Sequence, residues 1–139
     1  MGTTNFDVVQ AAGFIGDVTG TLAAFAAVER TATAAPGGTT GVIADGGGAF
    51  QVVAVTSDNA DKVITLPAPV PGTVVVLING ATGYELRSSA PATIAINGGS
   101  GANAESAVAA SKVVVAFCVS ATAWQAFSVA LTTVDGAAA

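Results

Sequence analysis

The chain has 139 residues, the length of one domain, and it is long enough to bury a core without disulfides or metals. Its four lysines and arginines are scattered and its net charge is −5, which argues against a nucleic-acid partner and a polybasic membrane patch. Charged residues make up only 9% of the chain and hydrophobic residues 52%, whereas about 25% charged residues is usual for soluble domains. A surface so poor in charge predicts an oligomer or a subunit of a larger assembly, with a simple Ala/Gly compositional bias as the alternative.

Residues 1–49 are expected to form an N-terminal arm and linker, because they are rich in Gly, Ala and Thr and only weakly periodic. Between residues 13 and 22 glycine recurs every three or four positions, which suits an extended arm with close backbone approaches. Within residues 21–30 the spacing of Leu22, Phe25 and Glu29 fits a short helix, and extended chain fits equally well. The first residues have neither the basic start nor the apolar centre of a signal peptide, so the sequence shows no recognisable export signal, which agrees with assembly in the cytoplasm.

Residues 50–139 are expected to form a β body. Short β-branched runs alternate there with segments rich in Gly, Pro, Asn and Asp, as is typical of strands separated by turns. The expected strands are residues 50–55, 63–66, 73–78, 84–87, 93–96, 106–110, 112–119 and 124–131, the last two joined as a hairpin across 120–123.

The segment at residues 73–78 is apolar at every position after Thr73, which predicts a central strand that is buried on both faces. Asn79-Gly80 follows it and predicts a turn with positive φ angles.

Eight short strands with turn signals between them predict an all-β fold, a jelly-roll or β-sandwich-like body with an extended Gly-rich N-terminal arm. A parallel α/β fold is disfavoured, because the chain has no helical crossovers between the expected strands.

Residues that carry chemistry are scarce. The chain has no histidine, which removes the commonest general acid/base and metal ligand and excludes Ser-His-Asp sites and the usual Cys/His zinc sites. Cys118, the only cysteine, lies in the apolar run 113–119 and is expected to be buried and unreactive. We therefore expect a protein that is not an enzyme, with no catalytic residue, no cofactor and no metal.

Four further features have a structural and a functional interpretation. Asp58 and Asp61 in the loop SDNAD fit a polar turn, and calcium is the alternative. The glycine clusters at 46–48 and 98–101 fit flexible turns, since no phosphate-loop lysine follows them. Trp124, at the start of a strand, is expected at an edge or rim, where it serves packing or an interface rather than sugar stacking, and Tyr84 is interpreted in the same way.

Two parts of the sequence resemble virion proteins of tailed bacteriophages. The arm NFDVVQAAGFIGDVTGTL is similar to the GDVTGxL segments near the start of phage fibre and capsid-decoration proteins. The body is similar to small phage decoration (cement) modules: ITLPAPVPGTVVVLING is followed by a short Tyr-containing strand, the turn Ile96-Asn97-Gly98, a loop with Asn103, a Val-rich strand and a Ser/Thr turn before Trp124. The resemblance covers residues 5–130 and rests mostly on structural motifs.

The resemblance implies a capsid decoration (cement) or head fibre protein. Such proteins form homotrimers on the capsid exterior at local threefold positions, where they clamp neighbouring subunits of the major capsid protein. On this hypothesis the β body supplies the trimer contacts and the arm docks on the capsid. The expected docking residues are Phe6, Val8, Val9, Gly13, Phe14, Ile15, Gly16, Asp17, Val18 and Leu22.

Two other interpretations remain open. The first is the receptor-binding tip of a phage tail or head fibre, with the loops 56–61 and 97–104 facing a host glycan. A free carbohydrate-binding or adhesin domain is the second.

Overall fold

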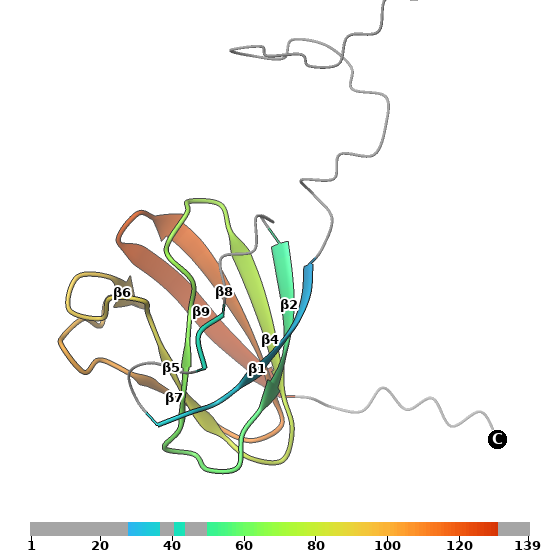
Figure 1. The fold of residues 1–139 in the computed structure, drawn as a ribbon. Coiled ribbons are helices and arrows are strands. Elements are labelled where there is room, and N and C mark those ends of the chain that lie inside the picture. Colours follow the sequence, from blue (N-terminus) through green and yellow to red (C-terminus); the bar gives the residue numbers. More distant parts are fainter. Residues whose placement is uncertain (1–27, 37–40, 44–49, 131–139) are drawn as a thin grey trace, which may run out of the picture.

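The computed structural model describes residues 28–36, 41–43 and 50–130 (Figure 1). These residues contain strands and no helix, so the all-β prediction is confirmed. The strands are β1 (Val28–Thr33), β2 (Phe50–Thr56), β3 (Val63–Thr65), β4 (Val74–Asn79), β5 (Tyr84–Arg87), β6 (Ala95–Ile96), β7 (Ser106–Val108), β8 (Lys112–Ser120) and β9 (Ala123–Ala130).

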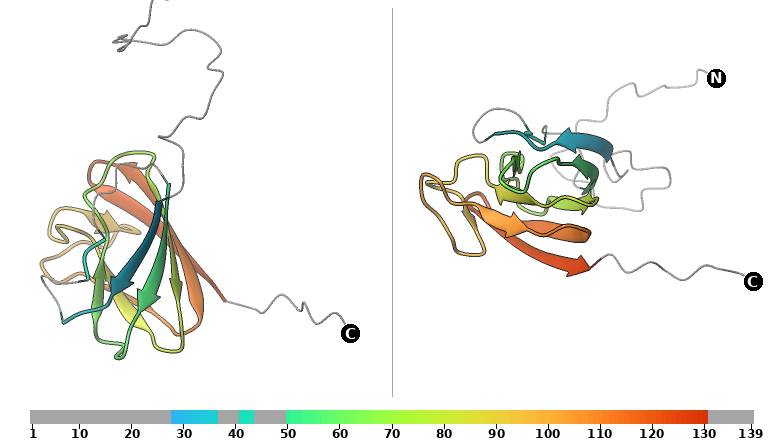
Figure 2. Two further views of the ribbon diagram at one scale, coloured as in Figure 1. Left: turned by 45° about the vertical axis from the view of Figure 1, so that its right-hand side comes forward. Right: turned by 90° about the horizontal axis from the view of Figure 1, so that it is seen from below.

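The strands form two sheets that lie on either side of one core (Figure 2). The larger sheet has six strands in the order β1-β2-β4-β8-β9-β6, and the smaller has three in the order β3-β5-β7. Side chains of both sheets meet in a single hydrophobic cluster, with Val53 and Leu77 from the larger sheet and Ile64 and Leu86 from the smaller. The body is therefore two-layered.

From β1 to β5 the chain winds like a short β-solenoid. Strands β1, β2 and β4 pair in parallel in the larger sheet, and β3 and β5 pair in parallel in the smaller. Between β2 and β4 the chain crosses to the smaller sheet at β3 and returns, so β3 takes the place that a helix occupies in a βαβ unit. Between β1 and β2, Ala35 and Val42 form bridges to β3.

This winding corrects the expectation of a jelly roll, which consists of antiparallel Greek keys. The alternation of apolar and polar residues shows that a strand has one buried face, but it does not specify which strand lies beside it.

The larger sheet ends in an antiparallel hairpin. Strand β8 pairs with β4 on one side and with β9 on the other, both antiparallel. The β8–β9 pair runs from Lys112↔Ala130 to Ser120↔Ala123, with an irregularity between Cys118 and Ser120. The hairpin expected across residues 120–123 is confirmed.

The core corrects the placement of Trp124. Its side chain is 0% exposed and belongs to the central cluster, rather than to an edge or rim. The reason is that β6 adds to the sheet beside β9, where Ile96 pairs with Trp124, so that this end of β9 is flanked on both sides. The packing role expected for Trp124 is confirmed.

Strand β1 extends the body toward the N-terminus. Residues 28–33 pair with β2, and Ala32 and Ala34 lie buried in the core. The β body thus includes a segment that the sequence assigned to the arm and linker. For the helix candidate at 21–30, residues 28–30 are strand, and the remainder lies outside the described residues.

Two Asn-Gly pairs play different parts. At Asn97-Gly98 the φ angles are 52° and 82°, and Ile96 and Gly99 exchange backbone hydrogen bonds of 3.0 and 2.9 Å, as in a two-residue hairpin turn. At Asn79-Gly80 neither residue has a positive φ, so the turn expected there is wrong in its geometry, although β4 does end at Asn79.

Candidate interaction surface

The ionisable side chains of the described residues are dispersed. Residues 28–36, 41–43 and 50–130 contain no group of three or more Asp, Glu, Cys or His side chains that could hold a metal ion. Two ion pairs join oppositely charged neighbours: Lys62 Nζ lies 2.6 Å from Asp58 Oδ1, and Arg87 Nη1 lies 3.3 Å from Glu105 Oε1. The hydrogen bond from Lys62 lowers the pKa of the Asp58 carboxyl.

The loop at residues 57–61 has the contacts of a polar turn. Ser57 Oγ donates to the Asn59 carbonyl oxygen at 2.8 Å, and the Asp61 backbone N–H donates to Asn59 Oδ1 at 2.9 Å. Since Asp58 is engaged by Lys62, the loop is closed by its own side chains and backbone. The interpretation as a turn explains these residues.

The loop at residues 97–104 is also tied to the body. Arg87 Nη2 donates to the Ala102 carbonyl oxygen at 2.8 Å, and Asn97 bonds both backbone groups of Ala126, each at 2.8 Å. The hollow beneath this loop has a volume of about 30 Å³. That space fits no more than one water molecule.

Three further sequence-predicted residues are core components. Cys118 is 3% exposed, its Sγ lies 3.2 Å from the Ser120 carbonyl oxygen, and burial raises the pKa of its thiol, so the prediction of a buried thiol is confirmed. Tyr84 is 1% exposed, and burial raises the pKa of its hydroxyl. Tyr84 Oη and Trp124 Nε1 have no hydrogen-bond partner among the described residues, and neither side chain is placed to stack on a ligand.

An apolar surface covers the outer face of the larger sheet. We define this outer face by three rows of residues that cross β2, β4, β8 and β9. Each row takes one residue from each of these strands, and consecutive members of a row are register partners. The rows are Phe50-Val74-Phe117-Gln125, Val52-Val76-Val115-Phe127 and Ala54-Ile78-Val113-Val129.

These side chains point away from the core, because the residues between them on each strand, such as Val53, Leu77 and Val114, are buried. Eleven of the twelve residues that make up the rows are apolar, Gln125 is the single polar one, and no member is charged.

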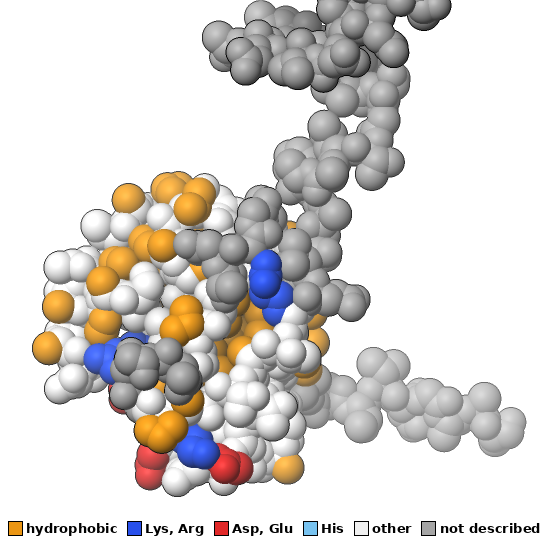
Figure 3. Space-filling view, viewed as in Figure 1, with side chains coloured by type: hydrophobic (Ala, Val, Ile, Leu, Met, Phe, Trp, Pro, Cys, Tyr) orange, Lys and Arg blue, Asp and Glu red, His pale blue; other side chains and the backbone are white. Residues whose placement is uncertain are grey.

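Several residues of the outer face are well exposed. Phe127 and Val129 are each 53% exposed, Ile78 is 40%, and Phe50 and Phe117 are 38%. Phe117 and Phe127 stack on neighbouring strands, with ring centroids 5.8 Å apart. Figure 3 shows a side of the molecule on which a few small groups of charged side chains and scattered hydrophobic side chains lie among uncharged polar side chains and backbone.

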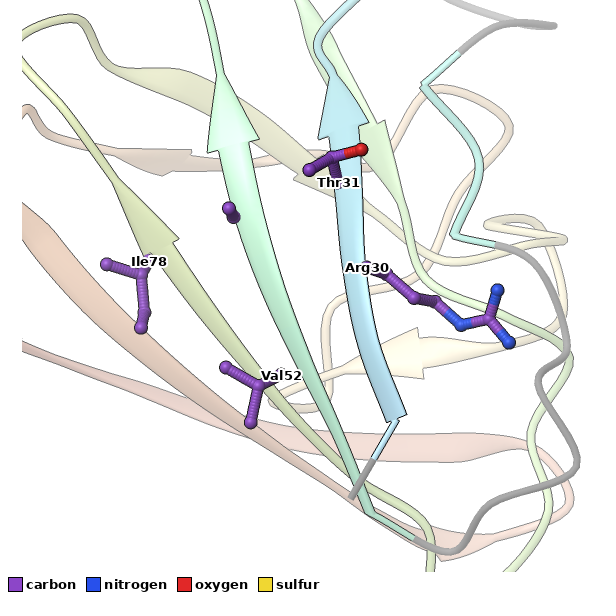
Figure 4. Close-up of a pocket in the computed structure, with 5 residues that line it drawn as sticks. Arg30, Thr31, Val52 and Ile78 are labelled. Atoms are coloured by element: carbon purple, nitrogen blue, oxygen red, sulfur yellow. The ribbon is translucent and has the colours of Figure 1, made fainter. Parts of the chain in front are cut away.

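An open hollow of about 420 Å³ lies at the β1 side of the outer face, lined by Arg30, Thr31, Val52, Ala54 and Ile78. Figure 4 shows Val52 and Ile78 projecting from neighbouring strands, while the Arg30 side chain extends away from both. No charged group is therefore directed into the hollow from these residues, and its floor is an extension of the apolar face.

Comparison of the chain with models of protein families, with curated proteins and with solved structures found no match. Among the described residues, no helix is long and apolar enough to cross a membrane. The expected docking residues, from Phe6 to Leu22, all lie outside the described residues.

The outer face was not predicted from the sequence, although the sequence contains a pattern that indicates it. The continuous apolar run of β4 was interpreted as a strand buried on both faces, and only one face of it is covered by the described residues. The apolar run in β8 likewise has only one covered face.

Proposed function

We propose that this protein is a structural virion protein, without enzymatic activity, that binds the outside of a phage capsid as a homotrimer and stabilises the shell. The observation that carries the proposal is the uncharged outer face of the larger sheet, whose residues Phe127, Val129 and Ile78 are 40 to 53% exposed. Contiguous apolar patches of this kind on a small protein mark interaction sites. The sequence resemblance to phage decoration modules supplies the identity of the assembly.

The mechanism is thermodynamic linkage. A protein that binds the assembled shell and not its separated subunits stabilises the shell by mass action, by about 2.7 kcal/mol per site at a free concentration 100 times Kd. Joining three copies makes the second and third contacts intramolecular, which raises the overall affinity by roughly 10²- to 10⁴-fold when the geometry allows simultaneous contact.

The receptor-binding alternative has less support. The described parts of the loops 56–61 and 97–104 carry no aromatic side chain for stacking on a sugar, and both loops are closed by their own hydrogen bonds. A glycan site needs a concave surface with several polar groups directed into it.

The test is co-sedimentation of the purified full chain with phage capsids that lack it. The proposal predicts saturable binding and a higher temperature of capsid disruption when the protein is bound. A variant without residues 1–22 tests the arm, and we expect it to lose capsid binding while keeping its oligomeric mass. Absence of binding by the full chain would overturn the proposed function, and undiminished binding by the truncated variant would remove the docking role of the arm.

A further inference from the structure

We infer that the open edge of β9 binds an extended, uncharged peptide strand of a partner protein, which continues the larger sheet beyond β6. The bound strand pairs with the backbone of Ser128 and Ala130 and places one small aliphatic side chain between the two sheets. The inference goes beyond the proposed function, because it assigns a peptide site to a part of the body other than the outer face and is tested without capsids.

The backbone of β9 has hydrogen-bonding groups that no described residue engages. In an antiparallel pair, successive residues direct their N–H and C=O groups alternately toward the neighbouring strand and away from it. Both backbone groups of Ala126 bond to the Asn97 side chain, so they point away from β8. The same alternation directs the N–H and C=O groups of Ser128 and Ala130 away from β8, and β6 pairs with β9 only at residues 123–124.

The contact between Asn97 and Ala126 shows what kind of group fits beside the open edge. The Asn97 amide donates to the Ala126 carbonyl oxygen and accepts from the Ala126 N–H, each at 2.8 Å, as the backbone of a paired strand does. The turn at Asn97-Gly98 then reverses the chain. A peptide backbone continues the same pattern at Ser128 and Ala130, whereas a sugar does not present N–H and C=O groups at strand spacing.

A hollow beside this edge has room for one side chain of the bound strand. Its volume is about 120 Å³, and its lining includes Leu86 and Val108 from the smaller sheet and Val114 and Ser128 from the larger. Ser128 is the register partner of the buried Val114 and so points to the core side, yet it is exposed, since the smaller sheet ends at β7. A cavity of about 150 Å³ holds one benzene molecule, whereas pockets for small-molecule ligands measure about 300–1,000 Å³. The hollow therefore suits a small aliphatic side chain.

The charges around the hollow favour an uncharged strand. None of the residues that line it is charged. Lys112 is the register partner of Ala130, at the end of the open edge, and Glu105, which precedes β7, is paired with Arg87. A charge directed into the hollow gains no partner from the lining, so the bound strand is expected to be uncharged beside residues 126–129.

The edge at β9 is the least protected one in the described part of the chain. Natural sheets discourage unwanted pairing with charges, prolines, very short strands or covering segments. The opposite edge strand, β1, contains Glu29 and Arg30, β3 is bridged by Ala35 and Val42, and β6 and β7 have only two and three residues. Residues 125–130 of β9 contain neither a charge nor a proline. Such an edge is the kind of site at which a further strand adds.

The probe is an end-capped, fluorescent nine-residue peptide that alternates Thr and Val, and its binding to the full-length chain is measured by fluorescence polarisation. Two further peptides of the same sequence are N-methylated, one on the Thr nitrogens and the other on the Val nitrogens. Only one set of N–H groups faces β9 in an added strand, because the backbone groups alternate in direction. We therefore expect one methylated peptide to lose binding and the other to keep it.

A pair of proline variants locates the site. Ser128→Pro removes an N–H that faces the added strand and leaves the pairing with β8 intact, because proline is tolerated on an edge strand where its nitrogen faces solvent. Thr31→Pro is the matched control at the opposite edge, where the Ala34 N–H bonds to Thr56 in β2 and the alternation directs the Thr31 N–H away from β2. Fluorescence of the buried Trp124 and far-UV circular dichroism report whether each variant is folded.

We expect saturable binding by the natural chain and by Thr31→Pro, and a Kd at least roughly 10-fold higher for Ser128→Pro. If Ser128→Pro does not fold, Ala130→Pro takes its place with the same expectation. The inference is overturned if the natural chain does not bind the peptide, if both methylated peptides bind equally, or if the two proline variants behave alike.

Two other occupants of the edge are outcomes of the same experiment. A natural chain that forms oligomers, which Ser128→Pro dissociates in light scattering, shows that a second copy occupies the edge. Peptide binding that appears only after residues 131–139 are removed shows that the chain's own terminus occupies it. Either result refutes a partner's strand as the occupant.

The two proposals fail differently. Peptide binding that Ser128→Pro weakens, in a chain that does not bind capsids, supports the site at β9 and refutes the capsid function. A chain that binds capsids and does not bind the peptide leaves the proposed function standing and refutes the site.

Discussion

Asn79 connects three segments of the chain and is the most informative single residue for testing the fold. It is the last residue of β4 and is 3% exposed. Its Nδ2 donates to the carbonyl oxygens of Thr82 at 3.2 Å and Ala109 at 3.0 Å, and its Oδ1 accepts from the Lys112 backbone N–H at 2.7 Å. One amide therefore fixes the end of β4 to the turn before β5 and to the start of β8.

Asn79→Ala removes all three hydrogen bonds at once. A hydrogen bond contributes about 0.5–1.5 kcal/mol net, so the upper limit for three is roughly 4.5 kcal/mol. Thr82 and Lys112 are half-buried and Ala109 is exposed, so water replaces part of what is lost. We expect the free energy of unfolding to fall by about 2–3 kcal/mol.

The assay is urea denaturation followed by Trp124 fluorescence, at one fixed protein concentration because association adds to stability. Asn103→Ala is the matched control, since Asn103 is an exposed loop residue, and it is expected to stay within about 0.5 kcal/mol of the natural chain. A change of less than about 0.5 kcal/mol in Asn79→Ala would refute the structural role assigned to this amide.

Three other substitutions or reactions probe separate parts of the body. Leu77→Ala deletes a fully buried side chain between the sheets and is expected to cost about 2–5 kcal/mol in the same denaturation assay, and a cost below about 1 kcal/mol would contradict the assigned core. Glu85 has its pKa raised by burial and then by the nearby Glu105 and Asp61, so its ionised form opposes folding and its contribution becomes less unfavourable as pH falls through that pKa. Glu85→Gln is therefore expected to raise the urea midpoint at pH 7, with a gain that shrinks toward about pH 4 and no gain at pH 7 if the reasoning is wrong. Cys118 is expected to resist a thiol reagent in the native protein and to react once urea unfolds it, whereas rapid native labelling would show that the thiol is accessible.

The strands of the β body were predictable because their residues alternate or run together in ways that local physics dictates. The expected segment 84–87 coincides with β5, and the expected hairpin of residues 112–119 and 124–131 corresponds to β8 and β9. Burial of Cys118 was predictable for the same reason, because the apolar run at residues 113–119 of a one-domain chain has to pass through the core.

The order of the strands was not predictable from such patterns. Parallel pairing of β2 with β4 depends on β3 crossing to the other sheet, and this is decided by burial between residues distant in the sequence. Strand β1 was not recognised because VERTAT contains two charged residues and follows a segment with helical spacing. Tertiary pairing with β2 outweighs that local preference.

The candidate surface was hidden by an ambiguity of the same kind. A strand that is apolar on both faces fits the interior of a sandwich and fits equally well a sheet whose second face meets another subunit. Val76 and Val115 show this, since they are register partners on the outer face and neither is fully buried in the single chain. The low charge content was the sequence feature that favoured association, and it did not locate the surface.

The most direct test of this account is the mass of the natural full-length chain in solution, measured by light scattering at micromolar concentration. The proposed homotrimer predicts a particle of three times the 13.3 kDa chain mass. A mass of 13.3 kDa that persists as the concentration is raised would contradict the account.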